Sequence, residues 1–246
     1  MRIRNPRKAP PPPKDEVAAH YDRYFSSVDR TDPAATLERY WYVLAKRYLG
    51  EVRGLRVLEI GCGMGDFSRY LADAGAIVVA ADLSPAAVAI TRRRLTGTDA
   101  TAVVADIENI PFDNESFDMV VSLETLEHVP DPDRALGELV RVTRRGGRLI
   151  VTTPNYMSLY GLGRLYLWLR RKPFCEAGDQ PINHPLTLVQ RVRTLRRLGC
   201  RVEAADGLGH LLPLPHFGTV ELRILERPHI LTKWFALESV TAATRL

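Results

Sequence analysis

The sequence predicts an α/β protein in which a seven-stranded, mostly parallel sheet carries helices on both faces. Two observations predict this fold. Short β-branched runs alternate with helical stretches from residue 56 onward, which is typical of right-handed βαβ units. The first of these runs leads directly into a glycine-rich turn. With 246 residues and an apolar fraction of 46%, the chain is long enough for one such domain with a cap but short for two.

The segment before the sheet divides into a tail and two helices. Residues 1–14 contain Pro10 to Pro13 and several basic residues, which predicts a disordered or polyproline-like tail ahead of a domain spanning residues 15–246. Between Glu16 and Leu49 the apolar and aromatic residues recur at helical spacing, and Asp32-Pro33 interrupts them. We therefore expect two N-terminal helices.

The sheet and its helices follow in order along the chain. The expected strands are Arg56–Ile60, Ile77–Ala81, Thr101–Ala105, Met119–Ser122, Arg148–Thr152, Arg201–Ala205 and Val240–Thr244, the last of them at an edge. The expected helices are Gly65–Ala74, Pro85–Leu95, Asp133–Thr143 and Leu186–Leu198. Residues 155–184 and 207–235 are then insertions, the first of them a cap after the fifth strand. They are expected to lie over the carboxyl ends of the strands, where ligands bind in such sheets.

The glycine-rich turn predicts a nucleoside-containing ligand. The stretch from Val57 to Gly65 places three glycines after an apolar strand, and Asp82 ends the second strand, where a carboxylate accepts from the hydroxyls of a ribose. A dinucleotide uses the same layout, but Asp66 occupies the sixth position of the turn. An acidic side chain at a helix N-terminus repels a pyrophosphate. S-adenosylmethionine carries no phosphate, so the sequence favours it.

These motifs resemble those of the class I methyltransferases, a Rossmann-like family. The pattern Glu59-x-Gly61-x-Gly63-x-Gly65 resembles their motif I, and the resemblance extends over about residues 50–155. The stretch Ala105-Asp106-Ile107, at the end of the third strand, resembles the segment that holds the adenine amino group in these methyltransferases. The resemblance implies S-adenosyl-L-methionine as cofactor. The residues that it implies for donor binding are Glu59, Gly61, Gly63, Gly65, Asp82, Leu83, Asp106, Ile107 and Leu123.

A second group of polar residues follows the fourth strand. Glu124, Glu127 and His128 lie within five residues of one another, and the later insertion could bring His184 back beside them. Such side chains could bind one divalent cation, Mg²⁺ or a transition metal, which would lower the pKa of an acceptor hydroxyl and align it. Without a metal, His128 or His184 is the candidate general base.

This second group carries a narrower resemblance. The pattern E-x-x-E-H, a later T-P-N and a downstream histidine resemble the ubiquinone-pathway O-methyltransferases and, similarly, the small-RNA 2′-O-methyltransferases. The resemblance implies Glu124, Glu127, His128 and His184 as metal ligands, although residues 182–186 match only loosely. In many metal-free class I methyltransferases a segment similar to residues 126–131 only shapes a turn.

We therefore predict O-methylation of a hydroxyl on a small hydrophobic acceptor, with divalent-metal assistance. A metal-independent C- or N-methyltransferase of secondary metabolism is the first alternative. RNA 2′-O-methylation and donor binding without catalysis are further ones. The basic N-terminal tail of this chain, whose net charge is +5, gives weak support to nucleic acid. No RNA-binding module is recognised, so nucleic acid is not an expected partner.

The remaining features concern the setting of the protein. Three widely spaced cysteines do not form a disulfide framework, which favours a cytoplasmic location. Apolar residues at helical spacing from Leu159 to Leu169, followed by Arg170, Arg171 and Lys172, are typical of a helix in peripheral contact with a membrane; burial against the sheet is the alternative. The apolar run from His210 to Phe217 suggests a lid. The sequence does not indicate an oligomeric state.

Overall fold

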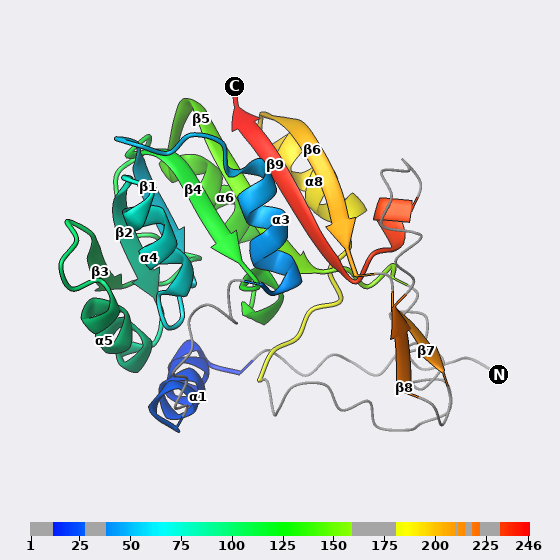
Figure 1. Ribbon diagram of the computed structural model, residues 1–246, viewed down its shortest axis with the longest axis horizontal. Helices are drawn as coiled ribbons and strands as arrows, with labels where there is room; N and C mark the ends of the chain where they lie inside the picture. Colours follow the sequence, from blue (N-terminus) through cyan, green and yellow to red (C-terminus); the bar gives the residue numbers. More distant parts are fainter. Residues whose placement is uncertain (1–11, 28–37, 159–180, 210, 215–217, 222–231) are drawn as a thin grey trace.

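The computed structural model describes residues 12–27, 38–158, 181–209, 211–214, 218–221 and 232–246. Within them, one seven-stranded sheet has the strand order β3-β2-β1-β4-β5-β9-β6 (Figure 1). The strands are β1 (Arg56–Ile60), β2 (Ile77–Asp82), β3 (Thr101–Val104), β4 (Phe117–Leu123), β5 (Thr143–Pro154), β6 (Cys200–Leu208) and β9 (Glu238–Arg245). The pairs among β1 to β5 are all parallel, and β9 runs antiparallel to both of its neighbours. The predicted seven-stranded, mostly parallel sheet is confirmed.

The position of the last strand corrects the sequence prediction. We expected Val240–Thr244 at an edge, but β9 lies between β5 and β6 and pairs with both. Its first six residues are buried, as expected for a central strand covered on both faces. Strand β6, in which exposed and partly buried residues alternate at the start, is the edge instead.

Helices cover both faces of the sheet, as predicted. On one face lie α3 (Tyr40–Leu49), α4 (Asp66–Asp73) and α5 (Pro85–Arg94); on the other lie α6 (Pro132–Val142) and α8 (Leu188–Arg197). Side chains of successive residues on β4 point to opposite faces. Met119 and Val121 therefore pack under α3 and α4, and Val120 packs under α6. Ser84 caps α5 by accepting from the backbone N–H of Ala87, as its place before Pro85 predicts.

Helix α1 (Lys14–Ser27) lies beyond the end of the sheet toward which β4 points, and it packs on α5 (Figure 1). Lys14 belongs to this helix, although the sequence assigned it to the tail. The insertion after β6 contains a hairpin of β7 (Leu211–Leu214) and β8 (Gly218–Glu221), followed by η3 (Thr232–Phe235). In the part of the chain that the structure describes, no helix is long and apolar enough to cross a membrane.

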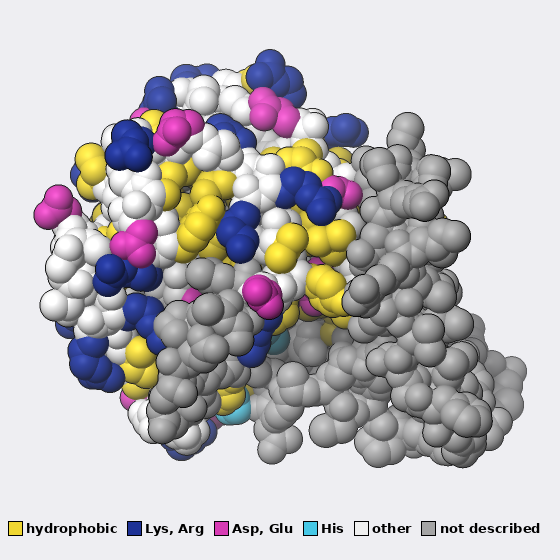
Figure 2. Space-filling model, viewed as in Figure 1, with side chains coloured by type: hydrophobic (Ala, Val, Ile, Leu, Met, Phe, Trp, Pro, Cys, Tyr) yellow, Lys and Arg dark blue, Asp and Glu magenta, His cyan; other side chains and the backbone are white. Residues whose placement is uncertain are grey.

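Several predictions concern residues that the structure does not describe. They are the disordered tail up to residue 11, the interfacial helix after residue 158 and most of the lid around residues 210–217. Over the described surface, Figure 2 shows Lys and Arg side chains interspersed with Asp and Glu on the face that carries α3 and α4. This distribution gives no further support to nucleic acid as a partner.

Candidate active site

The glycine-rich turn after β1 forms one wall of a cavity at the carboxyl end of the sheet. Gly61, Gly63 and Gly65 have φ values of 79°, 52° and 78°, a region that residues with a Cβ rarely adopt. A Cβ at Gly61 would overlap the side chain of Thr125, and one at Gly65 would lie 2.7 Å from Cγ2 of Thr91. The close packing of the turn therefore requires glycine at these two positions.

Asp82 is fixed at the end of β2, beside the turn. Its Oδ2 accepts from the backbone N–H of Gly63 and its Oδ1 from that of Ser84, both at 2.9 Å. Burial raises the pKa of Asp82, and the two backbone hydrogen bonds oppose that rise. Each carboxylate oxygen has a second lone pair, so Asp82 is positioned to accept from neighbouring hydroxyls of a ligand in the cavity.

Asp106 lines the same cavity and is paired with the N-terminal helix. Lys14 Nζ lies 2.5 Å from Asp106 Oδ2 and 2.7 Å from Glu108 Oε2. The other oxygen of Asp106 accepts from the backbone N–H of Glu108 at 2.8 Å. The carboxylate that the sequence assigns to the adenine amino group is thus also the contact that holds the start of α1.

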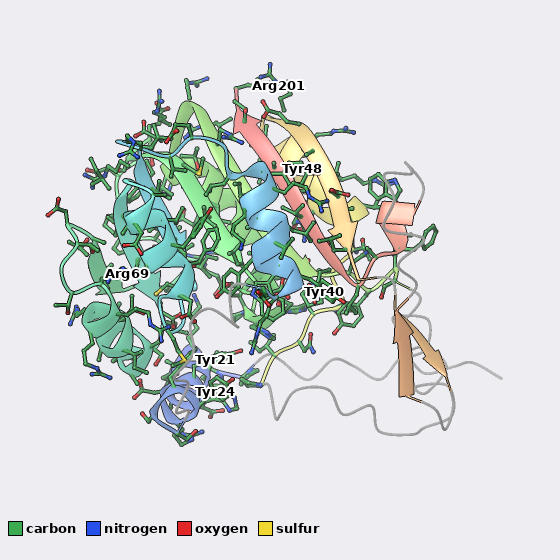
Figure 3. The ribbon with its side chains drawn as sticks, in the orientation of Figure 1. Tyr21, Tyr24, Tyr40, Tyr48, Arg69 and Arg201 are labelled. Carbon is green, nitrogen blue, oxygen red and sulfur yellow. The ribbon has the colours of Figure 1, made fainter. Side chains whose placement is uncertain are left out.

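Helix α1 covers the cavity through its aromatic side chains. Asp22 Oδ1 accepts from the Ser84 hydroxyl at 2.9 Å and from the Ala86 N–H at 2.7 Å, which fixes the middle of α1 to the start of α5. The Phe25 ring packs against Gly63. Tyr21, labelled on α1 in Figure 3, lines the cavity, with its ring centroid 6.2 Å from that of His128.

The residues predicted to bind the donor fall into two groups. Those that line the cavity are Gly61, Gly63, Asp82, Leu83, Asp106 and Ile107. Glu59, Gly65 and Leu123 do not line it; all three are buried. The Glu59 carboxyl group accepts from the Ser68 hydroxyl of α4, and burial raises its pKa to about 8. Glu59 therefore holds α4 against β1 beneath the turn.

On the acceptor side, β4 leads into Glu124 and then into η1 (Leu126–His128). His128 lines the cavity, and its Nδ1 lies 3.0 Å from the Ile182 carbonyl oxygen. Because a carbonyl oxygen only accepts, Nδ1 carries the proton in this hydrogen bond, and Nε2 of the neutral ring is an acceptor. Burial, the largest cause, lowers the pKa of His128, with further lowering from His184 and His20. The imidazole is thereby kept neutral near pH 7.

Next to His128 lies a charge cluster of the partly buried Glu124 and the buried Glu127, Glu238 and Arg191. Burial raises the pKa of both Glu124 and Glu127 to about 8, and Arg191 interacts electrostatically with all three carboxyl groups. The guanidinium also donates to three hydroxyls, those of Thr153, Ser239 and Thr241. Glu124 alone of the four lines the cavity.

The predicted metal site is not supported by this arrangement. Among the residues that the structure describes, no three His, Cys, Asp or Glu side chains form a group that could hold a metal ion. The physical reason is that Arg191 already supplies the positive charge beside Glu124 and Glu127.

His184 lies close to this cluster but outside the cavity. Its backbone N–H donates to the Glu127 carbonyl at 2.7 Å, and it lines a neighbouring groove between α6 and α8 together with Asp131 and Arg193. Of the two predicted candidate bases, His128 is the one that opens onto the cavity.

The sequence analysis missed three residues of the site: Lys14, Arg191 and Glu238. Arg191 carried a signal, because it falls on the same helical stripe as Leu188 and Leu195, which are buried. Its place in a basic stretch that runs to Arg197 obscures this signal. Neither Lys14 nor Glu238 has a comparable signal, since each is a charged residue beside a segment boundary.

Comparisons with known proteins bear on the family of this chain. A model of the methyltransferase domain family matches residues 58–151. A demethylmenaquinone methyltransferase of Clavibacter sepedonicus is 39% identical over 55% of this chain and 57% of its own length. One from Renibacterium salmoninarum is 38% identical over 74% of this chain and 77% of its own length. This chain thus spans a little over half of the first relative and about three quarters of the second.

Solved structures share the fold at lower identity. An S-adenosylmethionine-dependent methyltransferase from Mesorhizobium loti has a TM-score of 0.64 and 22% identity, covering 85% of this chain and 99% of its own. One from Aquifex aeolicus has a TM-score of 0.58 and 16% identity, covering 88% of this chain and all of its own. These likenesses concern the fold alone.

Proposed function

This chain belongs to the class I S-adenosylmethionine-dependent methyltransferases, and we propose that it methylates a hydroxylated, hydrophobic ring of the quinol type. The observation that supports the proposal most is that His128 opens onto the same cavity as the donor residues Gly63 and Asp82. Methyl transfer to a hydroxylated acceptor needs a base and a donor side by side. The name shared by the relatives, demethylmenaquinone methyltransferase, supports a quinone-related acceptor.

The donor side of the cavity fits S-adenosylmethionine. Asp82 would accept from the ribose hydroxyls and Asp106 from the adenine amino group, while the turn from Gly61 to Gly63 leaves room for close approach. When bound, the donor supplies an electrophilic methyl group on a sulfonium.

His128 is the residue that we propose as general base. Its Nδ1–H donates to Ile182, and its unprotonated Nε2, which lies 3.6 Å from Glu127 Oε1, is the atom that we propose to accept the proton of an acceptor hydroxyl. An unperturbed phenol has a pKa of about 10, so a base that removes the hydroxyl proton during methyl transfer increases the rate. Because the pKa of His128 is lowered by burial, the imidazole is in the required neutral form at neutral pH.

The acceptor side of the cavity is apolar, which suits a hydrophobic ring. Its lining includes Val17, Tyr21 and Phe25 from α1, together with Val129 and Pro130 after η1. These side chains exclude water from the hydroxyl that His128 would deprotonate. A cytoplasmic setting with contact at a membrane surface remains part of the proposal, because an acceptor with an apolar tail partitions into lipid.

The methylated atom is either the hydroxyl oxygen or a ring carbon beside it. Deprotonation of a phenol places negative charge on both, so the same base serves either reaction. The E-x-x-E-H motif favours oxygen, whereas the quinone-related names of the relatives do not specify the atom. Metal assistance has no support beyond the sequence motif.

The test is a donor-consumption assay with a panel of reduced quinols, catechols and single-hydroxyl naphthols, with each product analysed by mass and by NMR. We expect a quinol to gain one methyl group, and chelation of divalent cations to leave the rate unchanged. His128→Gln should lower kcat about 10²- to 10⁴-fold without weakening the binding of S-adenosylhomocysteine. His184→Gln should have a much smaller effect.

Two outcomes would overturn this proposal. One is turnover of none of these acceptors by a protein that binds S-adenosylhomocysteine. The other is an equal loss of kcat in His128→Gln and His184→Gln. Such a result would mean that the position of His128 on the cavity does not make it the base.

A further inference from the structure

Glu108 is a buried acid on the donor side of the cavity that contacts two segments outside its own loop. It is 3% exposed and lines the cavity two residues after Asp106. Its Oε1 accepts from the backbone N–H of Asp131 at 2.7 Å, and its Oε2 lies 2.7 Å from Lys14 Nζ. Distances this short are typical of contacts in which one partner or both are charged. Glu108 therefore joins the donor loop both to the start of α6 and to α1.

The segment that Glu108 holds on the acceptor side is stiff. Pro130 and Pro132 flank Asp131, and a proline fixes its own φ and keeps the residue before it extended. Val129 and Asp131 both have the extended backbone that this predicts. Since neither proline has an N–H, the N–H of Asp131 is the backbone donor that lies between them. Its hydrogen bond to Glu108 thus sets how far this segment lies from the donor loop.

This segment continues directly from the candidate base. His128 ends η1, and Val129 and Pro130 line the cavity beside it. A displacement of Pro130 away from the donor loop would therefore move His128 relative to the donor. A misplacement of about 1 Å in an active site can lower the rate about 100-fold. The placement of His128 thus depends on Glu108 as well as on the hydrogen bond to the Ile182 carbonyl.

Lys14 connects this arrangement to the helix that covers the cavity. Its Nζ pairs with Glu108 and also with Asp106, the carboxylate that the sequence assigns to the adenine amino group. A donor bound beneath α1 would contact Tyr21 and Phe25 and keep the helix closed. The closed helix in turn keeps the Lys14 ammonium beside Glu108, where a buried carboxylate would otherwise lack this positive charge.

We propose that Glu108 is a positioning residue that couples the two sides of the cavity: it holds the His128 segment against the donor loop, most firmly when a bound donor keeps α1 and Lys14 in place. This inference rests on the proposed function, in which His128 is the base. Donor binding then orders the acceptor side before the acceptor enters. By linkage, an acceptor that binds the ordered side raises the affinity for the donor by the same factor.

The amide of Asp131 reports on this contact directly. Hydrogen exchange followed by mass spectrometry, with fragmentation around residues 129–133, would measure it, because the two flanking prolines contribute no amide. Local opening that requires release of the ligand is suppressed at most about 100-fold when the ligand is present at about 100 times its Kd. In wild type we therefore expect S-adenosylhomocysteine at that concentration to slow the exchange about 10- to 100-fold.

Glu108→Gln separates the two contacts of the carboxyl group. A glutamine oxygen still accepts from the Asp131 N–H, but the neutral amide does not pair with Lys14. Without ligand, we expect exchange within about threefold of wild type, whereas the slowing by S-adenosylhomocysteine should fall below about threefold. Glu108→Ala removes both contacts and should leave the Asp131 amide in fast exchange in either state. Arg134 Nε also donates to the Glu108 carbonyl, at 2.8 Å, so α6 stays attached to the donor loop in both variants.

The matched control is Glu138→Gln. Glu138 also joins the loop after β3 to α6, since its Oε2 accepts from the Ile110 N–H at 2.9 Å, but it lies outside the cavity lining. This variant should show the wild-type slowing. In turnover of an acceptor from the panel, Glu108→Ala should lower kcat about 10-fold or more and leave the KM for S-adenosylmethionine within about threefold. Circular dichroism would verify that each variant is folded.

Three results would overturn the inference. The first is exchange at Asp131 that S-adenosylhomocysteine does not slow in wild type. The second is full slowing in Glu108→Gln or an equal loss of slowing in Glu138→Gln, because either would detach the effect from Lys14 and the cavity. The third is a wild-type kcat in Glu108→Ala. Because the exchange measurements need only S-adenosylhomocysteine, they remain decisive if no panel acceptor is turned over, the outcome that overturns the proposed function.

Discussion

Replacement of Arg191 by methionine would remove the positive charge from among three buried carboxyl groups. Arg191 is 3% exposed, and its side chain interacts electrostatically with Glu124, Glu127 and Glu238. Methionine is long enough to fill most of the space that the aliphatic part of arginine occupies. The substitution therefore tests the charge and the hydrogen bonds more than the packing.

The expected loss of stability follows from the cost of a buried charge without a partner. Removing one partner of a buried ion pair costs about 3–5 kcal/mol, and the three hydroxyls that lose a donor add to this cost. We expect a loss of about 3–5 kcal/mol at pH 9, a large share of the roughly 5–15 kcal/mol of a typical domain. For a chain of this length that corresponds to a fall in Tm of about 6–20 °C.

The loss should depend on pH with a definite sign. The folded-state pKa values of Glu124 and Glu127 are about 8, above the ordinary value of 4.5. Stability from these raised pKa values is therefore fully present below pH 4.5 and is lost as pH rises through 8. At pH 6 the protonated carboxyl groups need no counter-charge, so Arg191→Met should cost much less there than at pH 9.

Urea unfolding at pH 6 and pH 9 measures this difference. The matched control is Arg201→Met, whose arginine side chain is 65% exposed and should change stability by no more than about 0.5 kcal/mol at either pH. Equal losses for Arg191→Met at the two pH values, or a loss below about 1 kcal/mol at pH 9, would refute the reasoning.

Two further predictions concern the attachment of helix α1 and the pH dependence of catalysis. Lys14→Ala removes the ion pairs to Asp106 and Glu108. Because the lysine side chain is 43% exposed, the free energy of unfolding should change little. S-adenosylhomocysteine, however, should dissociate several-fold faster in stopped-flow measurements. High salt should reduce the difference, and identical dissociation rates at low salt would contradict a role for Lys14 in holding α1. In pH profiles from 5 to 9, kcat should rise with a midpoint below 6.5 as His128 loses its proton.

The donor side of the site was predictable because its residues are local in sequence. The turn from Gly61 to Gly65 follows one strand, and Asp82 and Asp106 each end or follow another. The carboxyl ends of neighbouring parallel strands meet at one edge of the sheet. Alternating strands and helices therefore predict both the fold and the gathering of these side chains, without knowledge of any tertiary contact.

The acceptor side was only partly predictable, because its geometry depends on contacts between distant segments. The E-x-x-E-H motif identified Glu124 and Glu127 as site residues but suggested a metal as their partner. The charge beside them comes instead from Arg191, at a position of α8 that faces the core. An arginine within a basic stretch has the composition of a solvated surface, and only the apolar residues around it distinguish the buried position from the exposed ones.

The placement of β9 explains why the acceptor side includes a residue from the end of the chain. Because β9 runs antiparallel to β5, its first residue, Glu238, pairs with Pro154 at the edge where β4 and β5 end. A parallel strand at this position would bring its last residue there instead. The start of β9 therefore faces the acceptor side while remaining outside every motif that binds the donor. We therefore expect a substitution at Glu238 to change the polarity of the acceptor side and to leave the affinity for S-adenosylhomocysteine intact.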